Sequence, residues 1–444
     1  MWDSAWVGDA LGAPGPRGLR FTGVSTDTRH LTPGTLFVAL QGERFDAHAF
    51  LGPAKQAGAA AAVVRRGTPP VDGLPYFEVD DTVAALGLLA RARRRLLPPG
   101  SPVVAITGSS GKTSTKEMIR AVLGTAYRVH ATSGNLNNLV GVPLTLLATP
   151  DDVEALVVEA GASVPGEIAR LRAVIEPTIA VITNVGYAHV AGFGSLAGVM
   201  VEKLALLEGV RRAVVGTDPP ELAAEARRRA PTVVAGTAPE AELRPDRAEL
   251  DDEGHPRLTW RGHTVTLPVV GFHQMENAML ALAVGREAGA DPASAVAALA
   301  GVRLPAGRGA VLMLGGLTVI DDTYNANPDS LHWAVKLAHW LAGRRQRPLV
   351  VVVGSMLELG RESGRLHAAA AAEIAALRPA LVAAVGEFVP AFEPHRAALA
   401  ERLITAPDAD ALGPRLKAAL TGNEIVLLKA SRGVALERVL RHLN

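Results

Sequence analysis

The chain of 444 residues contains no cysteine and no long apolar run. Without thiols it can build neither a disulfide scaffold nor a thiolate metal site, and a reducing compartment fits this composition. No segment approaches the ~18 consecutive apolar residues that a membrane-spanning helix needs. The opening MWDSAWVGDALG lacks the basic segment and apolar core of a signal peptide. We therefore expect a cytoplasmic protein with no membrane insertion.

An excess of charge of one sign is also missing. The sequence has 45 Lys and Arg residues against 44 Asp and Glu, for a net charge of +1. Nucleic-acid-binding domains usually carry a basic excess, so we expect no nucleic-acid partner. Lysine and asparagine are scarce, at 7 and 9 residues. Most of the asparagines fall in four short clusters, which mark either turns or functional positions: Asn135, Asn137, Asn138, Asn184, Asn277, Asn325 and Asn327.

The clearest motif is a glycine-rich loop between a strand and a helix. The apolar run Val103–Ile106 leads into Gly-Ser-Ser-Gly-Lys-Thr, which ends at Thr113, and a helical pattern follows. Backbone N–H groups in such a loop hold phosphate oxygens. Lys112 would reach the β- and γ-phosphates, and the Thr113 hydroxyl would ligate Mg²⁺. The strict pattern has a glycine where this chain has Ile106, so the loop is a short variant that predicts nucleotide binding.

Strand-like and helical segments alternate along the chain, which predicts parallel α/β architecture. Pro- and Gly-rich stretches around residues 97–102 and 304–309 are candidate linkers and hinges. We predict three α/β domains that divide the chain at these stretches. They are residues 1–98, a central domain of residues 99–306 with a parallel sheet and the phosphate loop, and a Rossmann-like domain of residues 307–444. Residues 256–270 are predicted to form an antiparallel insert.

Residues beyond the loop indicate which groups could take part in the reaction. Glu159 follows the apolar strand Leu156–Val158, at the edge where parallel sheets bind ligands, and its carboxylate could hold Mg²⁺. Asn184 and His189 follow another predicted strand, so His189 could lie at the same edge. Lys203 is flanked by apolar residues in a helical run. At this point a structural histidine and a solvated surface lysine remain open as alternatives.

Together these motifs resemble the Mur ligases, the ATP-dependent amide-bond-forming enzymes of peptidoglycan precursor synthesis. The short loop and the residues after it recur in the family's order. Four stretches resemble the members that add D-alanyl-D-alanine to UDP-N-acetylmuramoyl-tripeptide: Gly134–Asn138, Gly192–Leu196, Asp321–Pro328 and Lys429–Arg432. The N-terminal residues Asp27–Arg29 and Leu36–Gly42 look like a UDP-sugar domain. The Asn-Pro-Arg clamp expected of tripeptide-forming relatives is absent.

The resemblance implies the three-domain Mur ligase architecture, ATP and Mg²⁺ as cofactors, and an acyl-phosphate intermediate. It also implies a role for each matching residue. Catalysis would involve Lys112, Glu159, His189, Lys203, Arg308 and Asp322. ATP would be bound by Gly108, Ser109, Ser110, Gly111, Lys112, Thr113, Ser114, His273, Asn277, Arg308 and Asp322. Mg²⁺ would be held by Thr113, Glu159, His189 and Lys203, the last as a carbamate. The UDP substrate would meet Thr26, Asp27, Arg29, Gly42, Asp46, His48, Asn135, Asn137 and Asn138. D-Alanyl-D-alanine would meet Tyr324, Asn325, Asn327, Ser330, Glu358, Ser431 and Arg432.

Several residues depart from the family pattern, and other functions stay open. Ala47 and Ala430 replace expected glycines, Gln274 replaces an asparagine, and Ser355 replaces an aspartate in the presumed dipeptide region. Another amide ligase of the family, such as a tripeptide synthetase, is the nearest alternative, and a regulatory P-loop ATPase is a more distant one. A GTPase would need an Asn-Lys-x-Asp motif, which the chain lacks. We expect a monomer.

Overall fold

The structure is a computed structural model that describes residues 2–42 and 45–443. Two compact units make up the chain. Unit 1 contains residues up to 105 together with 127–161 and 167–178, and unit 2 contains 106–126, 162–166 and everything from 179 onward. The boundaries of the three predicted domains stay a prediction, and their outermost residues, 1 and 444, lie outside the described residues.

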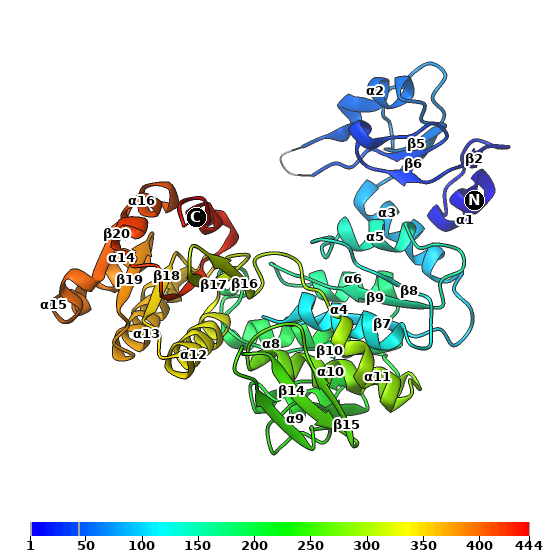
Figure 1. Cartoon of the computed structure of the whole chain (residues 1–444). Helices are drawn as coiled ribbons and strands as arrows, with labels where there is room; N and C mark the ends of the chain where they lie inside the picture. Colours follow the sequence, from blue (N-terminus) through cyan, green and yellow to red (C-terminus); the bar gives the residue numbers. More distant parts are fainter. Residues whose placement is uncertain (1, 43–44, 444) are drawn as a thin grey trace. The chain divides into compact units, whose positions relative to one another are not determined.

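Unit 1 contains a small parallel sheet in the order β3-β4-β5-β6 (Figure 1). Its members are short: β3 (Val24–Ser25), β4 (Leu36–Val38), β5 (Ala61–Arg65) and β6 (Tyr76–Val79). Phe37 and Val64 on these strands pack with Leu51 of α2 (Leu51–Gln56) in one buried cluster. A separate antiparallel pair, β1 (Trp2–Asp3) and β2 (Arg20–Phe21), flanks α1 (Ser4–Leu11).

Helix α3 (Thr82–Arg94) fastens the N-terminal sheet region to the rest of unit 1. It packs against α5 (Gly141–Leu147) and α6 (Glu167–Ile175). The Nε atoms of Arg91 and Arg95 donate to the two Glu176 carboxylate oxygens at 2.7 and 2.9 Å. These arginines, Arg95 first, lower the pKa of Glu176 to about 2. The stretch 97–102, predicted as a hinge, therefore lies beside a helix that ion pairs hold to its neighbours.

A six-stranded sheet supplies the phosphate-loop region, in the order β12-β11-β10-β7-β9-β8. Its strands are β7 (Val103–Thr107), β8 (Val129–Ala131), β9 (Ala155–Glu159), β10 (Ile179–Ile182), β11 (Arg212–Val215) and β12 (Thr232–Val234). The pairings β8–β9, β10–β11 and β11–β12 are parallel, as the alternating pattern predicts. In unit 2, α4 (Lys112–Leu123) packs lengthwise on α10 (His273–Glu287).

The remaining elements of this region are short. They are α7 (Val190–Phe193), α8 (Leu196–Leu204), α9 (Glu221–Arg227) and α11 (Pro292–Ala298). The predicted antiparallel insert is confirmed as β14 (Pro256–Trp260) and β15 (His263–Thr266). A third strand, β13 (Arg247–Leu250), pairs antiparallel with β14. The sequence analysis did not predict it, because its exposed polar residues carry no apolar run.

The C-terminal part of unit 2 is a second sheet, in the order β16-β17-β21-β18-β19-β20. Its strands are β16 (Ala310–Leu314), β17 (Leu317–Asp322), β18 (Leu349–Val353), β19 (Leu381–Val385), β20 (Leu403–Ala406) and β21 (Ile425–Lys429). All neighbours are parallel except the β16–β17 hairpin. Its helices are α12 (Pro328–Arg345), α13 (Ser363–Ala376), α14 (Phe388–Ala391), α15 (Arg396–Leu399) and α16 (Ala409–Ala419).

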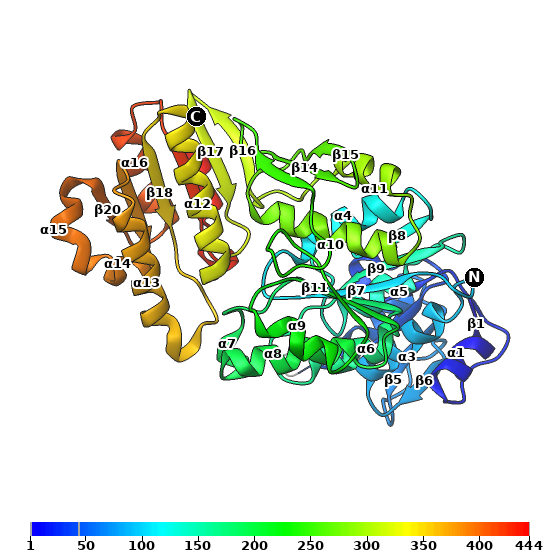
Figure 2. The same cartoon turned by 90° about the horizontal axis from the view of Figure 1, so that it is seen from below.

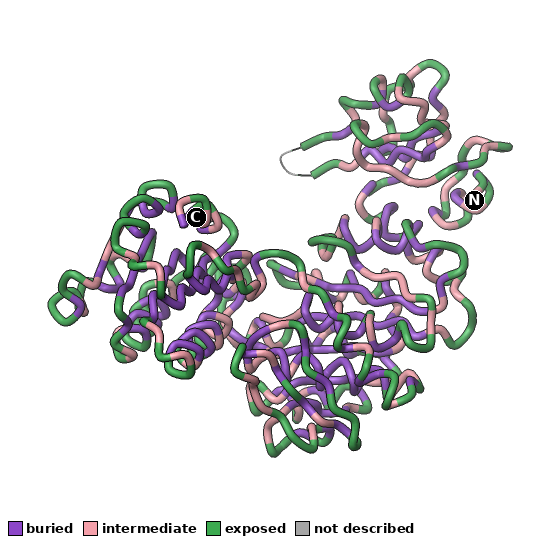
Figure 3. The backbone as a smooth tube through the Cα atoms, in the orientation of Figure 1, coloured by how far each residue is buried: buried purple, intermediate pink, exposed green. Residues whose placement is uncertain are grey.

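Helices cover both faces of this second sheet. Figure 1 shows α16 on one side of the strands and α12 and α13 on the other, and Figure 2 shows α12 lying along the sheet from a second direction. Alternate residues of β18 accordingly enter two different cores: Val351 packs in one and Val352 in the other. The inner strands β18, β19 and β21 are buried from end to end (Figure 3), which explains why they read as continuous apolar runs. Among residues 2–42 and 45–443, none of the helices combines the length and apolarity that crossing a membrane requires.

Candidate active site

The phosphate loop links β7 to α4 and has two glycines that cannot be replaced without strain. Gly108 has a φ of 149°, and a Cβ there would lie 1.9 Å from the Thr183 hydroxyl oxygen. Gly111 has a φ of 77°, and its Cβ would lie 2.6 Å from Asn277 Oδ1. Positive φ and close approach both call for glycine. The loop is therefore held between the segment after β10 and the first turn of α10.

Asn184 fastens the loop with three hydrogen bonds. Its Oδ1 accepts from the Ser110 N–H at 2.9 Å, its Nδ2 donates to Ser110 Oγ at 2.8 Å, and its carbonyl accepts from the Ser109 N–H at 3.1 Å. Ser109 Oγ in turn donates to the Gly186 carbonyl at 3.0 Å. The sequence analysis singled out Asn184 for its position after a strand but assigned it no role at the site.

We expect Asn184→Ala to raise the KM for ATP roughly tenfold, because a loop that loses its fastening must be ordered by the nucleotide. The melting temperature should change little. Asn423→Ala, at an exposed asparagine, is the matched control and should leave the KM unchanged. Steady-state kinetics with varied ATP checks this, and an unaltered KM in Asn184→Ala would contradict the assigned role.

Lys112 and Thr113 open α4. Lys112 Nζ donates to the Gly108 carbonyl at 2.7 Å, so the ammonium folds back over the loop. Thr113 is 2% exposed at the base of the loop. Both therefore lie directly after the loop, at the start of α4, and their phosphate- and Mg²⁺-binding roles stay a prediction.

The first turn of α10 packs beside the phosphate loop. Asn277 Oδ1 accepts from Thr115 Oγ1 at 3.0 Å, and Asn277 Nδ2 donates to Gln274 Oε1 at 2.9 Å. Gln274, one of the departures from the family pattern, is thus built into the network. The pKa of His273 is lowered to about 4, mainly by burial; the Asp322 carboxylate partly opposes this shift and the Lys429 ammonium adds to it. His273 is neutral in the folded chain at pH 7.

This neutral histidine predicts a pH dependence of stability. In the unfolded chain His273 has its ordinary pKa of 6.5, so the unfolded state binds the proton first as the pH falls. The free energy of unfolding should drop between pH 6.5 and 4, by roughly 2 kcal/mol at pH 5 from this group. Chemical denaturation at pH 7 and pH 5 measures the loss. His273→Gln should shrink it, and an equal loss in the variant would contradict the assignment.

Glu159 lies at the end of β9 in unit 1 and is 3% exposed. Asn137 Nδ2 donates to Glu159 Oε1 at 2.9 Å, and the Glu159 N–H donates to Thr132 Oγ1 at 2.9 Å. Asn138 instead accepts from the N–H groups of Val140 and Gly141 at the start of α5. One asparagine of this cluster therefore orients the predicted metal carboxylate, while another begins a helix.

Two Asp-x-basic motifs in unit 1 have the same local geometry. Asp27 Oδ1 accepts from the Arg29 N–H at 3.0 Å and Asp27 Oδ2 pairs with the guanidinium at 2.6 Å. Asp46 Oδ1 accepts from the His48 N–H at 2.9 Å and meets His48 Nδ1 at 2.6 Å. His48 Nε2 accepts from the Arg65 N–H, so Nδ1 carries the proton. Ala47, which stands between Asp46 and His48 where the family pattern has glycine, is buried. Thr26 and Gly42 flank these turns.

His189 and Glu358 contact each other in unit 2. His189 was predicted to bind Mg²⁺, and Glu358 was predicted to contact the dipeptide. His189 Nδ1 lies 2.5 Å from Glu358 Oε2, and the Glu358 carbonyl accepts from the Ala191 N–H at 3.0 Å. The His189 contact lowers the pKa of Glu358. Lys203, on α8, is 1% exposed, and its Nζ lies 5.7 Å from the centre of the Phe193 ring. The alternative of a solvated surface lysine is therefore wrong for Lys203.

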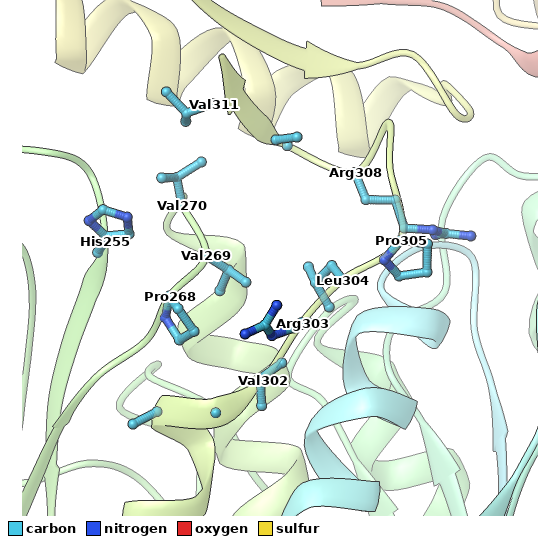
Figure 4. A pocket seen from close by; sticks show the side chains of 14 residues that line it. His255, Pro268, Val269, Val270, Val302, Arg303, Leu304, Pro305, Arg308 and Val311 are labelled. Atoms are coloured by element: carbon cyan, nitrogen blue, oxygen red, sulfur yellow. The ribbon is translucent and has the colours of Figure 1, made fainter. Parts of the chain in front are cut away.

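The second linker carries Arg308 and lines a cavity. The guanidinium of Arg308 lies 3.9 Å from the Tyr324 ring centre, and none of the described residues accepts a hydrogen bond from its buried Nε. A cavity of about 580 Å³ lies between this linker and the insert region around Val270. Figure 4 shows Arg308 extending away from Val269 and Val270. An unsatisfied donor on a cationic side chain is what an incoming phosphate would need.

The loop after β17 is connected to both β21 and the phosphate loop. Asp322 Oδ2 lies 2.6 Å from Lys429 Nζ. Asn327 begins α12, with Ser330 completing a reciprocal capping box, and Asn327 Nδ2 donates to the Ser109 carbonyl at 3.3 Å. Ser431 Oγ donates to the Ala326 carbonyl at 3.1 Å. Asn325 and Arg432 belong to the same group. Of the predicted dipeptide residues, Asn327 therefore contacts the nucleotide loop and Ser431 contacts the segment just before it, while Glu358 contacts His189.

Two residues that differ from the family pattern, Ser355 and Ala430, lie near this loop. Ser355 Oγ accepts from the Glu387 N–H at 2.9 Å, and its carbonyl accepts from the Ser431 N–H at 3.0 Å. Ala430 is fully buried, and a Cβ at Gly354 would lie 3.0 Å from the Ala430 methyl. Ser355 therefore supports the loop that carries Ser431.

The sequence analysis named Lys429 in the stretch Lys429–Arg432 but assigned it no role in the site. The notable signals were present: it is one of only 7 lysines, and it follows an apolar strand directly. Its 2% exposure and its pairing with Asp322 are properties of the folded sheet and become visible only there.

Comparison with known proteins identifies the family. The Mur ligase middle domain matches residues 106–285, and the Mur ligase glutamate ligase domain matches residues 307–432. The UDP-N-acetylmuramoyl-tripeptide–D-alanyl-D-alanine ligase of Bacillus subtilis (strain 168) is 37% identical over 429 residues, covering 95% of this chain and 93% of the relative. The chain belongs to the Mur ligase family. The Escherichia coli (strain K12) ligase of the same name is also 37% identical, over 440 residues, with 95% and 93% covered.

Solved structures of Mur ligases share the fold. A crystal structure of MurF from Acinetobacter baumannii superposes with a TM-score of 0.90 at 29% identity, covering all of this chain and 98% of that one. MurF from Thermotoga maritima in complex with ADP gives a TM-score of 0.82 at 29% identity, with 95% and 96% covered. The predicted Mur ligase architecture is therefore confirmed, and the regulatory P-loop ATPase is not favoured.

Proposed function

We propose that the chain is an ATP-dependent ligase that joins D-alanyl-D-alanine to UDP-N-acetylmuramoyl-tripeptide and gives UDP-N-acetylmuramoyl-pentapeptide, ADP and phosphate. One observation carries the proposal. The loop Asp321–Pro328, which resembles the dipeptide-adding members, lies against the phosphate loop through the bond from Asn327 Nδ2 to the Ser109 carbonyl. Relatives that bear this activity in their names match nearly the whole chain.

The chemical problem is that a carboxylate is a poor electrophile. An oxygen of the tripeptide's terminal carboxylate attacks the γ-phosphorus of ATP, which forms an acyl phosphate and releases ADP. The amine of the dipeptide then attacks the acyl carbon, and phosphate leaves with that oxygen. The dipeptide ammonium gives up two protons in all, one before the amine attacks and one from the tetrahedral adduct; the departing phosphate takes one and solvent takes the other. Catalysis of this kind depends on holding charge in place more than on covalent help.

The chain offers cations and donors for the transferring phosphate. The N–H groups of Gly108–Thr113 surround the phosphates, and Lys112 neutralises them from the start of α4. Arg308, with its unsatisfied Nε beside Tyr324, would add a second cation from the linker. His273 and Asn277 line the nucleotide wall, and Asp322 would meet the ribose or a metal-bound water.

The residues fit Mg²⁺ as it is used with ATP. This ion takes oxygen ligands, and it is usually held by one or two carboxylates together with substrate phosphates. No three His, Asp or Glu side chains gather into a metal site within residues 2–42 and 45–443. Thr113, Glu159, His189 and Lys203 as a carbamate would hold the ion, and it would neutralise charge on the phosphates.

Unit 1 would hold the UDP portion of the first substrate. The two Asp-x-basic turns place Arg29 and His48 after parallel strands, where ligands bind in open sheets. Asn135 and Asn137 would complete the contacts. We propose that the enzyme acts in the cytoplasm as a monomer.

The test is phosphate release from ATP and Mg²⁺ with UDP-N-acetylmuramoyl-tripeptide, with and without D-alanyl-D-alanine. We expect release that depends on the dipeptide. Release stimulated by a single amino acid would instead assign the chain to a sibling ligase of the family. Absence of stimulation by either would overturn the proposal while leaving nucleotide binding intact.

A further inference from the structure

Lys429 is a buried cation that binds the loop after β17 from within the sheet. It is 2% exposed and lies directly across from Asp322 in the parallel register of β17 and β21. Its Nζ donates to Asp322 Oδ2 at 2.6 Å and to the Asn325 carbonyl at 2.9 Å. The Asp322 carbonyl lies at 3.5 Å. One ammonium therefore joins the two ends of the segment Asp322–Asn325.

That segment contacts groups that belong to the two halves of the reaction. Tyr324 lies between two cations, with Arg308 at 3.9 Å and Arg432 at 5.8 Å from its ring centre. Three residues further on, Asn327 reaches the carbonyl of Ser109 in the phosphate loop. The conformation that Lys429 imposes on the segment thus sets the position of the linker cation and of the contact with the nucleotide loop.

A lysine buried this fully contributes a positive charge and three hydrogen-bond donors. Removing one member of a buried ion pair leaves the other charge uncompensated, while a hydrogen bond to a charged group is among the stronger ones in proteins. The Asn325 carbonyl and the Asp322 carboxylate both accept from the same ammonium, so losing it frees both ends of the segment at once.

We propose that Lys429 is a positioning residue that couples the nucleotide site to the dipeptide site by fixing the Asp322–Asn325 segment. The proposal rests on the proposed function for the identity of the dipeptide. Lys429 acts through Asp322 and through the loop that carries Tyr324 and Asn327.

The test compares Lys429→Met with Lys429→Arg and with Lys336→Met, which removes an exposed lysine from α12. In Lys429→Met we expect the KM for ATP and the KM for D-alanyl-D-alanine to rise together, each roughly 10- to 100-fold. The KM for the UDP substrate should stay within about twofold, since its expected contacts lie in unit 1. Lys429→Arg should recover part of both losses, and Lys336→Met should behave as the wild type.

ADP binding measured by calorimetry provides a readout without turnover. Weaker ADP binding in Lys429→Met, with a cooperative melting transition retained, supports coupling through the segment. Wild-type ADP affinity and wild-type KM values in a folded Lys429→Met would overturn the proposal. An enzyme in which all three KM values rise equally would overturn it too, because a merely structural role predicts a uniform effect.

If Lys429→Met does not fold, the comparison moves to Asp322→Asn against Asp322→Asn/Lys429→Met, in which the buried charge is balanced. A rise in the dipeptide KM on adding the second change supports the link through the Asn325 carbonyl, and no change overturns it. The ligase function itself is tested by a different result. A wild-type enzyme that shows no dipeptide-dependent phosphate release would contradict that function, while the ADP measurement would still decide whether Lys429 positions the nucleotide side.

Discussion

Lys112→Met is expected to lower kcat/KM for the ligase reaction by at least about 1000-fold while the protein stays folded. The ammonium neutralises charge that grows on the transferring phosphate, and no neutral side chain replaces it. Methionine keeps the length and the helix preference that the first position of α4 needs. In the free enzyme the substitution removes the hydrogen bond from Nζ to the Gly108 carbonyl, which is a local bond within the loop.

The measurement is dipeptide-dependent phosphate release, with the melting temperature recorded in parallel. Lys336→Met is the matched control, because it makes the same substitution at an exposed lysine on α12, outside the phosphate loop. The Lys336 Nζ atom lies 4.7 Å from the centre of the Trp333 ring. This variant should retain wild-type kinetics. If Lys112→Met kept substantial activity, the loop would have to serve some purpose other than holding a reacting phosphate.

Lys203→Arg is expected to be as inactive as Lys203→Ala, at least about 100-fold below the wild type. The Mur ligase resemblance implies a carbamate on Lys203, which turns a cation into an oxygen-donor anion. Arginine keeps the positive charge of lysine but does not form that carbamate. If Lys203 acted as a simple cation, the arginine variant would keep part of the activity.

The response to bicarbonate also distinguishes a carbamate on Lys203 from an unmodified Lys203 cation. Wild-type enzyme prepared in carbon dioxide-free buffer should lose activity and regain it when bicarbonate is added, whereas neither variant should respond. The burial of Lys203 beside Phe193 agrees with a modified side chain that stays out of solvent. Full activity in Lys203→Arg, with no effect of bicarbonate on the wild type, would rule out the carbamate.

The sheets could be predicted from the sequence because their strands are buried on both faces. The strands β18 and β19 are buried along their whole length, since helices on both sides of the sheet require unbroken apolar runs. The edge strand β16 carries no such signal. Its residues alternate between half-buried and exposed, which leaves no apolar run to recognise.

Residue order along the chain also predicted much of the candidate site. The loop, its lysine and the positions after β10 could be recognised because parallel strands place their carboxyl ends together. What the sequence could not predict are relations across the fold. The pairing of Lys429 with Asp322 depends on which strands are neighbours. The fastening of α3 near the expected first hinge depends on Arg91 and Arg95 meeting Glu176, which lies far along the chain.

The central claim is that a carboxylate is activated by ATP and then captured by D-alanyl-D-alanine. The most direct measurement uses UDP-N-acetylmuramoyl-tripeptide with oxygen-18 in its terminal carboxylate, and follows both products by mass spectrometry. The account predicts the pentapeptide mass and one labelled oxygen in the released phosphate. Unlabelled phosphate, or a product that lacks the dipeptide, would contradict it.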